Sequence, residues 1–119
     1  MRWCVEFAAQ AEQDFALILD HLVESYAAFG ETQAEAETRA AQRIEAILED
    51  SCRIATAPHR GSRHDDLIPG LRQLMLGKAI VWFIADESSG LIRILAVFFG
   101  AQDQQRRMLI SLLERRRDR

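Results

Sequence analysis

Two arginines in the second half of the chain are the side chains best placed to bind an anion. Arg72 stands at the start of an apolar run, and Arg93 is the only charged residue between Leu91 and Phe99. A guanidinium in an apolar strand must reach solvent or pair with an anion. Either each arginine lies on the open face of a sheet, paired with acids from the helices, or this face binds an anionic group or a partner's acidic segment.

The other chemically active side chains form no known motif. The sequence contains no GxxxxGK[ST], GxGxxG, HExxH or GxSxG pattern. His59 and His64 stand near Asp65 and Asp66, but one polar loop without an apolar shell makes a poor metal site. His21 lies alone in an acidic region. We therefore expect no metal and no cofactor.

Length and composition indicate one globular domain. The 119 residues fit a single core, so we expect one domain over residues 1–119, with residues 115–119 as a frayed basic tail. No apolar run approaches the roughly 18 to 20 residues that span a bilayer, and Met1 to Gln10 lacks the regions of a signal peptide. Cys4 and Cys52 form no CxxC pair. We expect a cytoplasmic protein that does not bind membranes.

The net charge of -3 is unevenly distributed. Residues 1–50 carry three arginines and eleven acidic residues, whereas residues 51–119 carry twelve basic and seven acidic residues. The first half is therefore acidic at -8 and the second mildly basic at +5. A basic half attracts an acidic partner, but +5 over 69 residues does not by itself indicate nucleic-acid binding.

The first half of the chain predicts a strand and a helical hairpin. Apolar residues alternate from Arg2 to Phe7, as in a strand. A helix then runs from Ala8 to Gly30, because its large apolar residues recur every three or four positions: Phe15, Ile18, Leu22, Tyr26 and Phe29. Thr32 and Glu35 have the spacing of a capping box, which starts a second helix that continues toward Pro58. The short connection makes the two helices antiparallel.

The second half predicts a β-meander. A polar connector at 57–70 precedes three strands, at Leu71–Leu76, Ala79–Ala85 and Leu91–Phe99. Gly77-Lys78 suits a type II′ turn between the first two. From Gln102 we expect a C-terminal helix with Met108, Leu109, Leu112 and Leu113 on one side. The predicted fold is α+β, in the order β-α-α-β-β-β(-α), with a long helical hairpin packed on a small antiparallel sheet.

The order of several marks across the chain resembles a known family. Pro58 and Gly61 follow the second helix, PGLR (69–72) opens the meander, and FGAQD (99–103) closes its last strand. Arg63, Asp65, Asp66 and Leu67 stand between them. With the order of elements, these marks resemble the RelE/ParE superfamily of toxins from bacterial type II toxin–antitoxin modules. The resemblance covers nearly the whole chain.

The resemblance implies a toxin that a cognate antitoxin neutralises, and two activities compete. RelE-like members cut mRNA on the ribosome with several cations and a Tyr or His near the C-terminus, whereas ParE-like members inhibit DNA gyrase by binding. Here Leu74 stands where a second basic residue is expected, Ala101 and Gln102 follow Gly100, and the C-terminal segment has no Tyr or His. The resemblance therefore favours a ParE-like inhibitor that is not an enzyme, with a RelE-like ribosome-dependent endonuclease as the alternative.

The resemblance also implies partner surfaces. Such a toxin binds its antitoxin and, if ParE-like, DNA gyrase, and reaches DNA only through the antitoxin. The candidates for target binding are the cationic and polar residues of the second half: Arg60, Arg63, Arg72, Arg93, Gln102, Arg106 and Arg107. The candidates for antitoxin binding are apolar or aromatic: Phe15, Leu22, Tyr26, Leu74 and Trp82.

Overall fold

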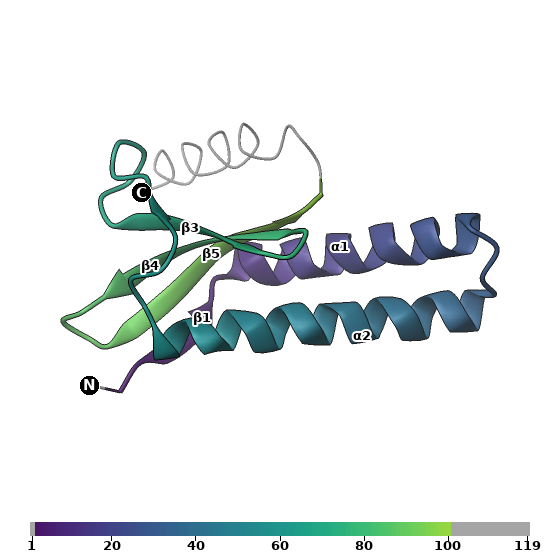
Figure 1. Cartoon of the computed structure of the whole chain (residues 1–119), viewed down its shortest axis with the longest axis horizontal. Coiled ribbons are helices and arrows are strands. Elements are labelled where there is room, and N and C mark those ends of the chain that lie inside the picture. The colour runs from purple at the N-terminus through teal and green to yellow at the C-terminus, as the bar shows by residue number, and fades with distance from the viewer. Residues whose placement is uncertain (1, 101–119) are drawn as a thin grey trace.

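A helical hairpin packs against one face of a five-stranded sheet (Figure 1). The structure, a computed structural model, describes residues 2–100, so the expected C-terminal helix and the tail at 115–119 lie outside the described residues. The elements are β1 (Cys4–Phe7), α1 (Ala9–Ala28), α2 (Gln33–Cys52), a 3-10 turn (Arg53–Thr56), β2 (Ser62–Arg63), β3 (Leu71–Leu76), β4 (Ala79–Asp86) and β5 (Leu91–Phe99). This is the predicted α+β order, with β2 added.

The helical hairpin forms where its local signals place it. Gly30 has a φ of 100°, which a residue with a side chain adopts only at a cost, and it lies in the turn after α1. The capping box is present, because Thr32 and Glu35 exchange hydrogen bonds at the start of α2. The prediction that this helix reaches toward Pro58 is wrong, since α2 ends at Cys52 and a 3-10 turn follows. No helix within residues 2–100 is both long and apolar enough to cross a membrane.

The sheet has the order β1-β5-β4-β3-β2. The predicted sheet was antiparallel, whereas the observed sheet is mixed. Strand β1 pairs with β5 in parallel, while the other pairs are antiparallel. The cause is the hairpin. Two antiparallel helices return the chain to the end of the sheet where β1 began, so β3 runs in the direction of β1. After two reversals β5 runs the same way and meets β1 in parallel.

A bulge in β5 decides which residues face the helices. Trp82 lies opposite Ala96, but its neighbour Phe83 lies opposite Ile94, so Leu95 is an extra residue. Because of this extra residue, Ile94 and Val97 both face the helices, where they are almost completely buried. The opposite face carries a smaller apolar cluster around Trp82, which is 1% exposed.

A buried carboxylate joins α1 to the edge of β5. Strand β1 pairs with β5 only as far as Ile94, after which the Ala8 N–H donates to the Ile94 carbonyl. Beyond this point the Val97 N–H donates to Asp14 Oδ2 at 3.0 Å, and Gln10 donates to Oδ1 at 3.0 Å. Asp14 is only 7% exposed. A buried amide left without an acceptor is costly, so Asp14 replaces the ladder partner that the short β1 does not provide.

We predict that Asp14→Ala lowers the free energy of unfolding by about 1–3 kcal/mol, because the buried Val97 amide loses its acceptor. Denaturant unfolding followed by circular dichroism measures it. The control is Asp20→Ala, which removes an exposed carboxylate from the same helix and should change the stability by less than about 0.5 kcal/mol. Equal stability of the two variants would contradict the assigned role of Asp14.

Candidate functional site

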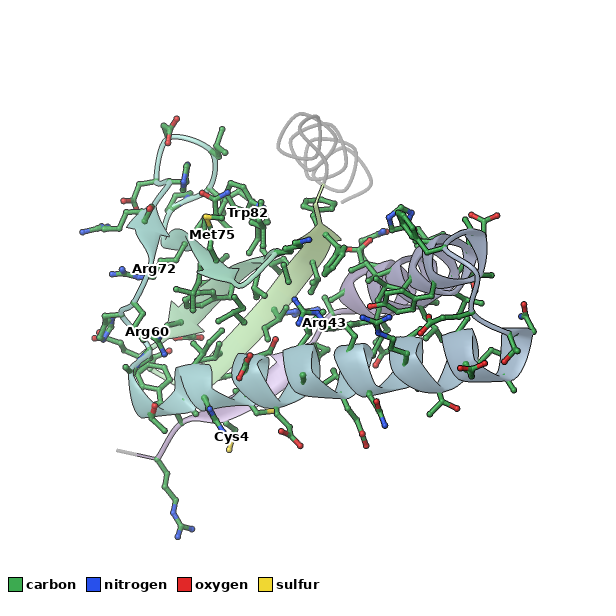
Figure 2. All side chains as sticks on the ribbon, turned by 45° about the vertical axis from the view of Figure 1, so that its right-hand side comes forward. Cys4, Arg43, Arg60, Arg72, Met75 and Trp82 are labelled. Carbon is green, nitrogen blue, oxygen red and sulfur yellow. The ribbon has the colours of Figure 1, made fainter. Side chains whose placement is uncertain are left out.

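Three of the predicted target-binding arginines lie together at one end of the sheet. Arg63 on β2 and Arg72 on β3 are direct partners in the antiparallel register. Arg60 precedes β2 in the connector, and Figure 2 shows it at the same end of the molecule as Arg72. We call Arg60, Arg63 and Arg72 the arginine cluster. The short strand β2, which the sequence did not predict, is what brings Arg63 beside Arg72.

Two members of the arginine cluster are held by local hydrogen bonds. Arg72 Nη1 donates to the His59 carbonyl at 2.8 Å, and Arg63 Nε donates to Asp65 Oδ2 at 2.9 Å. Both arginines keep further donors, since a guanidinium has five N–H groups. Within residues 2–100, no hydrogen bond or ion pair involves the exposed Arg60 side chain. The cluster therefore offers several charged donors to an anionic partner.

Asp65 organises the loop that follows β2. Its Oδ1 accepts a hydrogen bond from the Gly70 N–H at 2.8 Å, and its Oδ2 accepts from Arg63. The Gly70 amide, followed by the Arg63 side chain, holds the pKa of Asp65 below its usual range. The loop it closes folds over the sheet face that carries Trp82, where Leu67 and Ile68 pack on the small apolar cluster.

Arg93 does not belong to the arginine cluster. It lies opposite Ile84, which itself lies opposite Leu71, so these three side chains share the sheet face away from the helices. Arg72 lies opposite Phe83, a residue of the core under the helices. The expectation that both arginines lie on the open face holds for Arg93, which is exposed, and is wrong for Arg72. One ligand group cannot contact both from one face.

The two imidazoles in the same connector differ in their contacts, because His59 has an acidic partner and the buried His64 Nε2 has no hydrogen-bond partner in the described chain. His59 Nε2 lies 3.1 Å from a Glu87 carboxylate oxygen, and its ring meets Trp3 edge-on at 6.1 Å. The His64 ring lies against Trp82 with 4.9 Å between centroids. Tyr26, near the far end of α1, packs under the Arg39 guanidinium at 4.5 Å. Across residues 2–100, no three His, Cys, Asp or Glu side chains gather as a metal site would require.

The predicted antitoxin contacts divide by burial. Phe15 and Leu22 are 8% and 4% exposed in the core between α1 and the sheet, and Trp82 is buried on the other face. These three side chains stabilise the fold and present little surface to a partner. The amphipathic pattern showed that they are buried, but it did not show whether the protein itself or a partner buries them. Tyr26 and Leu74 are half-buried. Gln102, Arg106 and Arg107 lie outside the described residues.

Met75 is an apolar side chain that is 68% exposed, and it was not among the predicted binding residues. It lies on β3 between Leu74 and Leu76, which pair with Val81 and Ala79. Its exposure depends on where β2 ends, which local sequence does not reveal. The alternation of β3 (LRQLML) was the available signal, since it places Met75 on the face opposite Leu74.

Chains of toxin–antitoxin systems share this fold. A chain of the chromosomal ParDE TA system from P. aeruginosa superposes with a TM-score of 0.63 at 19% identity, covering 84% of this chain and 98% of that chain. A chain of the toxin–antitoxin complex RelBE2 from Mycobacterium tuberculosis gives a TM-score of 0.56 at 14% identity, covering 83% of this chain and 99% of that chain. No protein-family model and no curated protein matches the sequence. The architecture is thus the α+β fold found in ParDE and RelBE systems.

We predict that the Gly70 amide reports the titration of Asp65. The native hydrogen bonds favour the carboxylate, so their contribution to loop stability is complete above the ordinary Asp pKa of about 3.9 and is lost as the pH falls through the lower folded pKa. An NMR pH titration should therefore show a Gly70 transition with a midpoint below about 3.9. Asp65→Asn should abolish the transition. A midpoint at or above the ordinary value would contradict the assignment.

Proposed function

We propose that this protein is the toxin of a type II toxin–antitoxin module and belongs to the RelE/ParE superfamily. The observation that carries the proposal is the fold shared with ParDE and RelBE chains over almost their whole length. The marks Pro69-Gly70-Leu71-Arg72 and Phe99-Gly100-Ala101-Gln102-Asp103, at the two ends of the meander, support it independently. The cognate antitoxin is then the main partner, and contact with DNA occurs through the antitoxin.

Within this superfamily we assign the protein to the ParE-like group, which inhibits DNA gyrase by binding. The arginine cluster provides charged donors. Of the two imidazoles in the same connector, His59 lies 3.1 Å from Glu87, while His64 packs on Trp82 and its Nε2 is buried without a hydrogen-bond partner in the part of the chain that the structure describes. Tyr26 sits in the helical hairpin under Arg39. RNA cleavage needs a general acid or base that reaches the scissile phosphate. Among the described residues His64 Nε2 is buried and His59 is paired with Glu87, so neither imidazole is presented to a phosphate bound at the cluster. An inhibitor needs only a surface that binds.

The RelE-like alternative keeps one observation in its favour. Three arginines gather at one end of the sheet, which is also how a site for a scissile phosphate is built. His59 and His64 lie in the same connector and would have to leave Glu87 and Trp82 to act. Ribosome-dependent mRNA cleavage is therefore the activity to test against gyrase inhibition.

Two assays distinguish these activities. Purified protein is added to DNA gyrase and relaxed plasmid, and the rate of supercoiling is measured. In parallel, the gene is induced under tight control in cells. Blocked supercoiling with filamentation and a DNA-damage response supports the ParE-like assignment. Rapid translation arrest with mRNA cuts at codon positions would replace it with the RelE-like one, and normal growth without either effect would contradict a toxin of either kind.

We predict that Arg60→Ala combined with Arg72→Ala weakens gyrase inhibition at least tenfold, because charge-assisted hydrogen bonds to an anionic surface contribute about 1.5–3 kcal/mol. The measurement is the inhibitor concentration that halves the supercoiling rate. Arg39→Ala is the matched control, since this exposed arginine lies on the helical hairpin and pairs with Glu31. Thermal unfolding checks that the double variant is folded. Unchanged inhibition by a folded double variant would remove the arginine cluster from the target surface.

A further inference from the structure

A groove lies between the two helices of the hairpin, in the half next to the turn at Gly30. It has a volume of about 710 Å³ and is lined by residues of both α1 and α2. Its apolar lining consists of Leu19 and Val23, which are half-buried, and the exposed Ala41. Figure 1 shows that this half of the hairpin extends beyond the sheet. We call this feature the hairpin groove.

The hairpin groove opens on the face of the two helices that points away from the sheet. Asp14 marks the sheet side of α1, because it bonds to the backbone of β5. Arg43 marks the sheet side of α2, because its guanidinium lies over the last ring of β5 at 5.8 Å. At about 100° per residue, Val23 lies about half a turn around α1 from Asp14, and Ala41 lies about 160° around α2 from Arg43. The sheet therefore leaves the groove uncovered.

Three carboxylates line the hairpin groove, and none of its described lining residues is basic. Asp20, Glu24 and Glu37 are all exposed. Within residues 2–100 the Asp20 and Glu24 side chains form no hydrogen bond or ion pair, and Glu37 Oε1 accepts one bond from the Gln33 amide at 2.9 Å. Like charges four residues apart on a helix repel each other. A cationic segment bound over the groove would relieve this repulsion.

The chain contains a segment of complementary chemistry. Residues 104–117 carry five arginines and one glutamate, a net charge of 5 - 1 = +4. Their apolar residues Met108, Leu109, Leu112 and Leu113 have the spacing of one helix side. Arginines stand on both flanks of this apolar stripe, at 106–107 and at 115–117. A basic amphipathic helix of this kind fits an apolar groove that is bordered by carboxylates.

The described chain ends too far from its own groove for the whole of this segment to bind there. The Gly100 N–H donates to the Lys78 carbonyl, and the Phe99 ring lies under Arg43 on the sheet side of α2. The chain from Gly100 to Gln104 reaches at most about 14 Å. Passing halfway around a helix about 10–12 Å in diameter takes about 17 Å. The segment of a second copy approaches the groove from solvent and has no such limit.

We propose that residues 104–117 of one copy bind the hairpin groove of a second copy, and that the exchange is reciprocal. The apolar stripe would cover Leu19 and Val23, and the arginines on its flanks would pair with the three carboxylates. A reciprocal exchange closes about a two-fold axis and forms a dimer with two identical contacts. The proposal does not depend on the toxin assignment, because it uses only the groove and the segment.

Charge reversal tests the exchange between copies. The groove variant combines Asp20→Lys, Glu24→Lys and Glu37→Lys. The segment variant combines Arg106→Glu, Arg107→Glu, Arg115→Glu and Arg116→Glu. Each variant alone should weaken the dimer by about tenfold or more, because like charges then meet. An equimolar mixture of the two should restore the dimer, since each groove then meets a segment of opposite charge. Sedimentation velocity over a concentration series measures the dimer.

A matched control places the same change of charge outside the groove. Glu12→Lys, Glu49→Lys and Asp66→Lys replace three other exposed acids. This variant should keep the dimer affinity within about threefold, since charges more than about 8 Å apart are largely screened. Equal weakening by the control and by the groove variant would mean that net charge, rather than the groove, governs association, and it overturns the proposal.

NMR of a mixed sample gives the direct measurement, with one copy methyl-labelled and the other unlabelled. We expect contacts between copies that join the Val23 methyls to those of Leu109 or Leu112. Such contacts found only within one copy overturn the exchange, and so does an unaltered protein that stays monomeric at every concentration. If the Val23 methyls respond only to the protein encoded by the adjacent reading frame, the occupant is the antitoxin and the proposal is overturned.

Discussion

The hydrogen bond from the Val97 amide to the Asp14 carboxylate is the contact on which the arrangement of the two layers depends. Strand β5 has nine residues and β1 has four, so β1 pairs with β5 only from Leu91 to Ile94, and the stretch that follows lies beyond β1. Helix α1 covers this stretch, and Asp14 provides the buried acceptor there. With α1 positioned on β5, α2 follows through the short turn at Gly30, and the fully buried Ala36 and Ala40 pack α2 closely. The hairpin then extends well beyond the sheet (Figure 1).

At both edges of the sheet the edge strand is shorter than its neighbour, and the neighbour's remaining backbone is treated differently at each edge. Each has an edge strand that is too short, β1 beside β5 and β2 beside β3. At β5 an acid from α1 satisfies the exposed amide inside the protein. At β3 the turn at Gly61 removes the chain from the edge and leaves Met75 uncovered. The fold thus satisfies one edge with a buried carboxylate and leaves the other open by a glycine turn.

Local signals predicted the elements well, but not the contacts between them. The capping box at Thr32, the glycine turn at Gly77 and the three meander strands all occur as expected, because each depends on neighbouring residues. The parallel pairing of β1, the presence of β2 and the bulge at Leu95 depend on residues distant in sequence. Those non-local features determine which arginines lie together in the candidate site. They separate Arg72 from Arg93 and place Arg63 beside Arg72. A period-two pattern shows which residues alternate between the two faces of a strand, but a bulge reverses these faces for the residues beyond it.

The distribution of charge connects the fold to the proposed function. The acidic residues are concentrated in residues 1–50, most of which form the helical hairpin. The closed end of the hairpin lies far from the arginine cluster, whereas α2 ends beside it (Figures 1 and 2). The described chain extends over 48 Å along its longest axis, several times the screening length of about 8 Å at physiological ionic strength. The closed end of the hairpin and the arginine cluster therefore act as separate electrostatic surfaces. An acidic partner is attracted by the arginine cluster and repelled by the closed end of the hairpin, which orients it before any contact forms.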